Sequence, residues 1–320
     1  MVGEAMMSGV SFVVTVYNKE PFLPLVIEAL FAQTGEFDRE FIFIDDGSTD
    51  ASWDLLQRLT AGCRNIRLLR QANAGPAVAT NVAVRAASFP WLKIVDADDM
   101  LAPQCTELLL EAATRLQLRL ARVLAMNYRL GEPIDFDPGT LLDFQVRREN
   151  LLLSCLKNSP CNLSPLLIER ALFWEVGGCD ERLFTQDYSL LLRLTWRSDV
   201  AAIGPMPLTA SPIEAPNRVS DNQQRMLRET NLAMMFFLAE TPGLPWRHHW
   251  QAVERMFGRA WKWRRRKRGA GLSSRWFWLY ALARVAPPYL LRRLLPATLA
   301  AFVDPDPPVR GGDQLAPIDG

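Results

Sequence analysis

Residues 91–99 have the sequence Trp-Leu-Lys-Ile-Val-Asp-Ala-Asp-Asp, a largely apolar run that ends abruptly at three carboxylates. A short apolar run bounded by polar residues is typical of a buried strand. Val10–Val16 and Glu40–Ile44 are two earlier runs of the same kind, and each is also followed by polar residues. Ile66–Leu69 is a shorter one. The sequence therefore predicts four strands in the first hundred residues.

Helical segments alternate with these strands. Leu23–Gln33, Ala51–Ala61 and Pro76–Ala87 have helical patterns, and Asp50 is the expected N-cap of the second. Short loops join the alternating elements, which predicts a parallel, doubly wound α/β sheet.

The periodicity is weaker after the helix expected at Pro103–Leu120. Further strands are expected at Ala121–Leu130, Leu163–Ile168 and Val200–Ile203, and a Pro-rich loop at Pro205–Ser220. The remaining segments predict helices, at Asn150–Leu156, Ala171–Val176, Tyr188–Trp196, Met226–Ala239, Trp246–Trp263, Trp276–Val285 and Tyr289–Val303.

The composition of the chain excludes several classes of protein. Of its 320 residues, 49% are hydrophobic and 22% are charged, which excludes collagen-like and disordered chains. The five cysteines form no Cys-x-x-Cys pair, which makes a zinc ribbon unlikely and favours a reducing compartment. The two histidines, His248 and His249, lie near the C-terminus, so acid–base chemistry in the first two thirds must use carboxylates.

Polar clusters follow three of the predicted strands, at the sheet edge where ligands bind in such folds. They lie at residues 15–19, 45–48 and 96–99. Asp96 and Asp98 alternate along the chain and so face the same side. Hard oxygen ligands without Cys or His favour Mg²⁺ or Mn²⁺. A solvated acidic turn is the alternative for 96–99, and Asp-Gly in the second cluster is a common turn.

Six motifs resemble, in order, those of family 2 inverting glycosyltransferases, which have the GT-A fold. The resemblance covers roughly residues 11–220 and implies a Rossmann-like α/β domain, a mostly parallel sheet flanked by helices, with a C-terminal helical extension. The motifs are Val13-Val14-Thr15-Val16-Tyr17-Asn18-Lys19, Phe43-Ile44-Asp45-Asp46-Gly47-Ser48-Thr49-Asp50, Asn73-Ala74-Gly75, Val95-Asp96-Ala97-Asp98-Asp99, Gly177-Gly178-Cys179-Asp180-Glu181 and Thr185-Gln186-Asp187-Tyr188-Ser189-Leu190.

The resemblance implies a nucleotide-sugar donor, a UDP-, GDP- or dTDP-sugar. Thr15, Tyr17 and Asp46 would contact its base and ribose, with the Asp46 carboxylate on the base edge. Asn73 and Gly75 would lie along the nucleotide.

The resemblance also implies the metal and catalytic residues. Asp96 and Asp98 would form the D-x-D site for Mg²⁺ or Mn²⁺, with Asp98 as the direct ligand and Asp99 beside it. Asp187 would be the general base; the alternative is an N-cap of the following helix. Arg218, in the segment 216–220 that resembles a loop over the diphosphate, is expected to bring positive charge to the phosphates.

The implied reaction is a single displacement that inverts the anomeric carbon. Asp187 would take the proton of an acceptor hydroxyl as it attacks, and a metal would offset charge on the departing diphosphate. No Gln-x-x-Arg-Trp motif follows Asp187, which favours a hexosyltransferase that moves one sugar at a time. Assembly of polysaccharide, lipopolysaccharide or glycolipid is the expected setting.

Three positions depart from the family pattern. Gln186 stands where Glu is commoner, Thr80 where many relatives carry Arg, and Ala215 where His is frequent. These departures leave open an inactive relative that binds sugar nucleotides or acts as a scaffold. A nucleotidyltransferase is a further alternative, although residues 16–21 lack the Gly-rich basic loop that a triphosphate needs.

The C-terminal part of the chain is strongly basic. Residues 246–293 contain thirteen Lys or Arg and one acid, Glu254, although the net charge of the whole chain is +1. Six of the ten Trp lie between Trp246 and Trp278, and Arg264–Arg268 is the strongest charge run. Basic residues interleaved with Trp favour contact with an anionic membrane surface. Packing of the helices onto the first domain is the alternative, and nucleic-acid binding is not expected.

These patterns divide the chain into four expected parts. They are a flexible leader at 1–9, a GT-A domain at 10–222, a helical membrane-contacting segment at 223–303 and a disordered tail at 304–320. No secretory signal or clean membrane span is visible. We therefore expect a cytoplasmic protein, peripheral on the inner face of the membrane, whose hydroxyl acceptor includes lipid-linked molecules.

Overall fold

The computed structural model describes residues 9–136, 139, 143–158, 162–214 and 222–303. Almost all of the expected leader at 1–9 and the expected tail at 304–320 lie outside the described residues, as do Ala215 and Arg218 with the loop around it.

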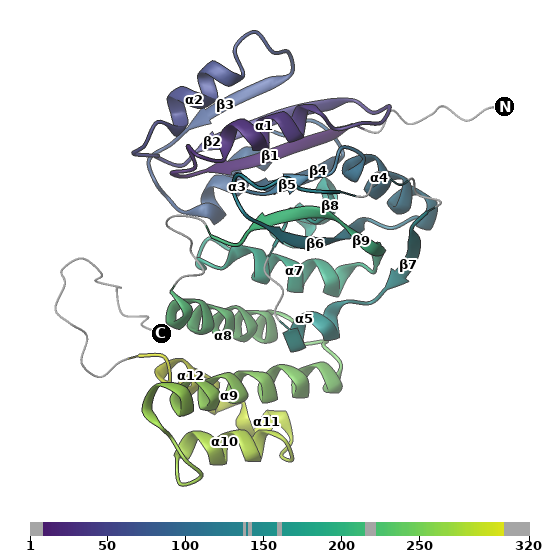
Figure 1. The fold of residues 1–320 in the computed structure, drawn as a ribbon. Helices are drawn as coiled ribbons and strands as arrows, with labels where there is room; N and C mark the ends of the chain where they lie inside the picture. Colours follow the sequence, from purple (N-terminus) through teal and green to yellow (C-terminus); the bar gives the residue numbers. More distant parts are fainter. Residues whose placement is uncertain (1–8, 137–138, 140–142, 159–161, 215–221, 304–320) are drawn as a thin grey trace.

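The first half of the sheet is parallel, as the sequence predicts. It contains β1 (Val10–Val16), β2 (Arg39–Asp45), β3 (Ile66–Arg70) and β4 (Trp91–Asp96), in the order β3-β2-β1-β4. The helices α1 (Leu23–Phe31), α2 (Ser52–Leu59) and α3 (Pro76–Arg85) connect them (Figure 1). Because strand order reverses at β1, polar residues at the ends of β1, β2 and β4 meet at one edge.

The expected N-cap of α2 is displaced by one residue. Ala51 occupies the cap position and makes no side-chain capping bond. Asp50 instead accepts a hydrogen bond from the Ser52 N–H at 3.0 Å, so its carboxylate still satisfies a first-turn donor.

The second half of the sheet is mixed. β8 (Leu166–Glu169) runs antiparallel to both β4 and β6 (Leu120–Tyr128), and β9 (Val200–Pro212) pairs in parallel with β6. Two strands that the sequence analysis missed, β5 (Met100–Leu101) and β7 (Gln145–Glu149), pair with β9. Short antiparallel strands of this kind carry little periodic signal of their own.

The prediction of a loop at Pro205–Ser220 is wrong for its first part, because β9 continues to Pro212. Pairing with β6 and β5 holds this segment extended despite its prolines. The register against β6 shifts between Arg122 and Leu124, which is a bulge or irregularity of the kind that accommodates proline in a strand.

Two hydrophobic cores cover the two faces of the sheet. Alternation along β1 sends Val13 to the core shared with α3 and α7 (Gln186–Arg197), and Val14 to the core shared with α1 and α4 (Cys105–Leu116). The helices α5 (Leu152–Asn158) and α6 (Arg170–Glu175) complete this part of the chain. Both faces are therefore buried, as a doubly wound sheet requires.

The C-terminal part is helical. It contains α8 (Gln223–Glu240), α9 (Trp246–Arg268), α10 (Arg275–Ala283), α11 (Pro288–Leu291), a 3₁₀ turn (Arg292–Leu294) and α12 (Leu295–Ala300). The single helix expected at Tyr289–Val303 is thus divided, and Pro296 stands in the first turn of α12, where proline is tolerated. α8 packs on α7, and α9 packs on α8, α5 and α10 (Figure 1).

No helix in the described ranges combines the length and the apolar character that crossing a bilayer requires.

Candidate functional site

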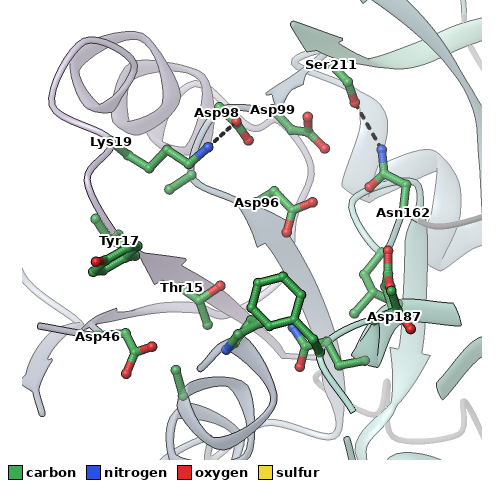
Figure 2. Close-up of a pocket in the computed structure, with 18 of the residues that line it drawn as sticks. Thr15, Tyr17, Lys19, Asp46, Asp96, Asp98, Asp99, Asn162, Asp187 and Ser211 are labelled. Atoms are coloured by element: carbon green, nitrogen blue, oxygen red, sulfur yellow. Dashed lines mark hydrogen bonds and ion pairs between the residues drawn. The ribbon is translucent and has the colours of Figure 1, made fainter. Parts of the chain in front are cut away.

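Residues from distant parts of the chain line one cavity of about 310 Å³ at the carboxyl ends of β1, β2 and β4. Figure 2 shows Tyr17 and Asp46 on one side of it and Asp187 on the other, with Asp96 between them. Six of the predicted site residues line this cavity: Thr15, Tyr17, Asp46, Asp96, Asp98 and Asp187.

The strand register explains how these side chains meet. Thr15 is paired with Asp96 across β1 and β4, and Val16 is paired with Asp45 across β1 and β2. Asp46 follows directly, and its N–H donates to the Val16 carbonyl at 2.8 Å. Parallel strands in register therefore bring the three polar clusters to one edge of the sheet.

Asp45 and Asp46 have different roles. Asp45 is fully buried and pairs with the Nε of Arg70 at 3.0 Å. Asp46 lines the cavity, but both of its oxygens already accept hydrogen bonds from the loop after β3. One oxygen accepts from Gln71 at 2.7 Å and from Ala74 at 2.9 Å, and the other accepts from Gly75 at 2.9 Å.

This loop explains why residue 47 is glycine. Gly47 has a φ of +73°, and an added Cβ would lie 2.7 Å from the backbone nitrogen of Asn73. The two predicted residues of this loop, Asn73 and Gly75, do not line the cavity. They lie beside it, and Gly75 acts on it through its hydrogen bond to Asp46.

Lys19 forms an ion pair with Asp98 across the cavity wall (Figure 2). Both side chains are largely shielded, with exposures of 20% for Lys19 and 10% for Asp98. The hydroxyl of Tyr128 donates to the backbone carbonyl of Asp98 at 2.8 Å, which holds the residue in place. The sequence analysis counted Lys19 in a polar cluster but gave it no role.

Three carboxylates, those of Asp96, Asp98 and Asp99, lie close together in the turn after β4. Asp98 and Asp99 are buried, whereas Asp96 opens onto the cavity. Burial among protein atoms, together with the charges of Asp99, Asp98 and Asp187, raises the pKa of Asp96 well above its usual value. Burial also raises the pKa of Asp99 to about 6, and its Oδ2 has no hydrogen-bond partner among the described residues.

These observations fit a divalent cation. An orphaned buried oxygen and closely spaced carboxylates are the environment that a cation stabilises, and the donor set contains only oxygen. Within the described residues, no group of three or more His, Cys, Asp or Glu side chains forms a ready-made metal site. Asp96 and Asp98 would therefore hold Mg²⁺ or Mn²⁺ together with water and substrate phosphates, the usual arrangement for magnesium.

Asp187 lies in the first turn of α7 rather than at its cap, which is Thr185. The backbone N–H of Tyr188 donates to its Oδ1 at 2.8 Å. Burial raises the pKa of Asp187 to about 6, and the Tyr188 bond only partly offsets that effect. A carboxylate with this pKa is suited to accept a proton near neutral pH.

Two of the departures from the family pattern are in contact. The Gln186 side chain is buried, and its Nε2 lies 3.3 Å from the Thr80 hydroxyl, to which it donates. Both side chains are neutral, so the contact buries no unpaired charge next to Asp187. The Gln186 Oε1 is buried without a hydrogen-bond partner among the described residues.

Asn81 of α3 holds the segment that precedes Asp187. Its side chain donates to the Cys179 carbonyl at 2.9 Å and to Glu181 at 2.8 Å, and it accepts from the Cys179 N–H at 2.8 Å. Gly178, with φ of +68°, makes room for it, because an added Cβ would lie 2.8 Å from the Asn81 Oδ1.

The sequence analysis missed several residues of the cavity. Asn162 donates to Ser211 at 3.0 Å, and both line the wall near Asp99 (Figure 2). Asn162 comes from the turn before β8, and Ser211 comes from the end of β9. Neither position follows a strand that the sequence predicts to be parallel, and the Pro-rich stretch around Ser211 predicted a loop.

Comparison with known proteins shows what the first part of the chain is similar to. A family model described as glycosyl transferase family 2 matches residues 11–133, which run from β1 past β6. This part of the chain is therefore similar to glycosyl transferase family 2. The uncharacterized glycosyltransferase EpsJ of Bacillus subtilis is 35% identical over 109 residues, 34% of this chain and 31% of EpsJ.

A second relative is the teichoic acid poly(glycerol phosphate) polymerase of Staphylococcus epidermidis. It is 28% identical over 159 residues, which is 49% of this chain and 22% of the polymerase. The chain thus spans less than a third of the length of either relative. The family model covers the first four of the six motifs, and the two motifs around Asp187 lie outside it.

The fold of the chain resembles that of S. aureus TarS, whose residues 1–349 were solved in complex with UDP-GlcNAc. The TM-score is 0.64 at 16% identity, and the likeness covers 92% of this chain and 88% of the TarS chain. At this identity the likeness establishes the GT-A fold, including its C-terminal helices, and nothing further.

Proposed function

We propose that the chain is an inverting glycosyltransferase that moves one sugar from a nucleotide-sugar donor to a hydroxyl acceptor. The observation that carries the proposal is the meeting of Asp46, Asp98 and Asp187, which are up to 141 positions apart, in one cavity. The match of residues 11–133 to glycosyl transferase family 2 supports it. The relative that polymerises teichoic acid supports an acceptor from the cell envelope.

The donor's nucleotide would bind at the β1 and β2 side of the cavity. Tyr17 is 44% exposed there and offers an aromatic face on which a base can stack. Thr15 supplies a hydroxyl beside it. Both carboxylate oxygens of Asp46 already accept hydrogen bonds from the loop at 71–75. Asp46 would therefore act mainly by fixing the shape of the cavity wall on the nucleotide side.

Asp187 would act as the base on the opposite wall. It would take the proton of the acceptor hydroxyl as that oxygen bonds to the anomeric carbon and the diphosphate leaves. A metal held by Asp96 and Asp98 would stabilise negative charge on the phosphates. Lys19, which already pairs with Asp98, places a further positive charge in the same region.

A screen of nucleotide sugars by thermal shift, with and without Mn²⁺, tests the donor assignment. A ligand that binds only the folded state raises the melting temperature, and at 100 times its dissociation constant it adds about 2.7 kcal/mol of stability. We expect one nucleotide class to raise the melting temperature more when Mn²⁺ is present. If UDP-, GDP- and dTDP-sugars all leave it unchanged, the donor assignment is wrong.

We also propose that the C-terminal helices contact an anionic membrane from the cytoplasmic side. Five large apolar side chains of α10, α11 and the turn between them are 45–73% exposed, and we call them the apolar patch: Trp278, Leu282, Val285, Tyr289 and Leu290. The exposed basic residues Arg275, Arg284 and Arg292 flank it. An apolar face bordered by cations is suited to lie in a membrane interface.

The side chains of the Trp-rich run itself mostly pack inward. Trp263 and Trp276 are buried, and Trp261 stacks on Tyr280 with ring centroids 5.3 Å apart. Arg264 donates to the carbonyls of Ala300 and Val303. The packing alternative thus describes most of this run, and the membrane proposal depends on the apolar patch instead.

Changing Trp278 and Val285 to Asp should weaken binding to vesicles that contain anionic lipid by at least about tenfold. Burying one large apolar side chain contributes roughly 1.5–3 kcal/mol, so the loss of two side chains is more than enough for a tenfold weakening of binding. Co-sedimentation with the vesicles measures the bound fraction. Leu25→Asp, on the exposed side of α1 at 39% exposure, is the control and should bind like the unchanged protein. Equal binding by all three proteins would exclude the patch.

A further inference from the structure

A second cavity, of about 420 Å³, lies between α8 and α9. Arg255, Arg259, Lys262 and Arg266 line it from α9, and we call it the basic groove. Their spacing of four, three and four residues places all four side chains on one helix face. No Asp or Glu is among the described residues that line it.

Three of the four cations of the basic groove have no acidic partner among the described residues. None of the ion pairs there includes Arg255, Lys262 or Arg266. The Nε of Arg255 is buried and has no hydrogen-bond partner among the described residues. A buried donor without a partner is costly, and like charges in one concavity repel each other. An anion in the groove would remove both costs.

The chemistry of the lining favours a phosphate group. Arginine forks match phosphate oxygens geometrically, and a lysine adds a point charge. Among the described residues of the lining, the one aromatic is Trp263, which is only 8% exposed. These residues therefore offer no open ring on which a nucleic-acid base could stack.

The basic groove adjoins the donor cavity. Met226, in the first turn of α8, lines both cavities. Figure 1 shows α8 lying between α7, which carries Asp187, and α9. A molecule in the groove can therefore extend past Met226 towards Asp187.

We propose that the basic groove binds the phosphate or diphosphate group of a phosphorylated acceptor and so directs its hydroxyl towards Asp187. The inference rests on the proposed glycosyltransferase function and adds the chemical class of the acceptor to it. The groove acts by positioning, and it takes no part in proton transfer.

Isothermal titration of the full chain, without divalent cations, tests the groove. The probes are inorganic pyrophosphate and farnesyl diphosphate. The groove variant Lys262→Ala with Arg266→Ala should bind the diphosphate probe at least tenfold more weakly than the unchanged protein. The control variant is Arg265→Ala with Lys267→Ala, which removes the same charge from the same helix outside the groove. It should bind normally, and all four residues are exposed, so folding should be preserved.

The outcomes separate the possible ligands. Tighter binding of farnesyl diphosphate supports a lipid-linked acceptor, and equal binding of both probes supports a soluble phosphorylated one. Equal weakening in both variants, or no binding of either probe, overturns the proposal. Preference for a single-stranded oligonucleotide over both probes also overturns it. The thermal shift with nucleotide sugars should be the same in both variants, so failure of the groove is distinguishable from failure of the donor site.

Discussion

Replacing Asp187 with Asn is expected to lower the turnover number by about 10²–10⁴-fold, the usual contribution of a general base. The amide keeps the size of the side chain but cannot take the acceptor's proton. The donor should still bind, because Asp187 lies across the cavity from Tyr17 and Asp46 (Figure 2). The measurements are release of nucleoside diphosphate with the donor found by thermal shift, and donor affinity by titration.

Asp54→Asn is the matched control for this substitution. Asp54 also lies in the first turn of a helix, α2, but it is exposed and outside the cavity. It should leave turnover unchanged, which separates loss of the base from loss of a favourable charge at a helix start. Turnover of the Asp187 variant within threefold of the unchanged protein would remove Asp187 as the base.

The pH profile gives the same prediction a second readout. A base works only when deprotonated, and burial raises the pKa of Asp187 to about 6. The rate should therefore fall as the pH drops through about 6, whereas an ordinary aspartate would stay active to near pH 4. The residual rate of the Asn variant should lack this acidic limb.

Replacing Asp98 with Ala is expected to abolish the gain in donor affinity that Mn²⁺ provides. The substitution removes the carboxylate that the resemblance implies as the direct ligand, and Asp96 alone would hold the cation with substrate phosphates. We expect donor binding at least about tenfold weaker in Mn²⁺ and unchanged in EDTA, as measured by titration. Identical Mn²⁺ dependence in the variant and the unchanged protein would exclude the metal role.

Lys19→Gln is the partner variant in that experiment. Because Lys19 already neutralises Asp98, its ammonium competes with a metal for the same carboxylate. Direct Mn²⁺ binding without donor should therefore strengthen in Lys19→Gln and weaken in Asp98→Ala. Weakening in both variants would mean that the ion pair holds the site together instead of competing with the metal.

The predicted and observed structures agree most closely in the first hundred residues. β1 matches the predicted strand at Val10–Val16, and β4 extends the prediction by one residue, to Asp96. Local signals suffice there, because β1, β2 and β4 are largely buried on both faces and each ends at a polar cluster. The later strands were not predicted because their signals are not local. β7 pairs with the start of β9, and the end of β9 pairs with β6 and β5.

The C-terminal helices show the same division. Their existence was predictable from periodicity and proline, and α9 covers the predicted helix and continues to Arg268. Which side of each helix faces inward was not predictable from the Trp and Arg content. Trp263 is buried while Trp278 is 63% exposed, although both belong to the same Trp-rich run.

The sequence by itself determined the parallel half of the sheet, the order of the family motifs and the acidic residues that carry the proposed chemistry. The strands, the turns that follow them and the motif residues show in the local order of apolar and polar residues, so composition and spacing record them. Only the tertiary structure decided that Lys19 meets Asp98, that Gln186 meets Thr80 and that four cations of α9 surround one groove. Such contacts join segments up to 106 residues apart, and a linear pattern carries no record of which side chains meet across that separation.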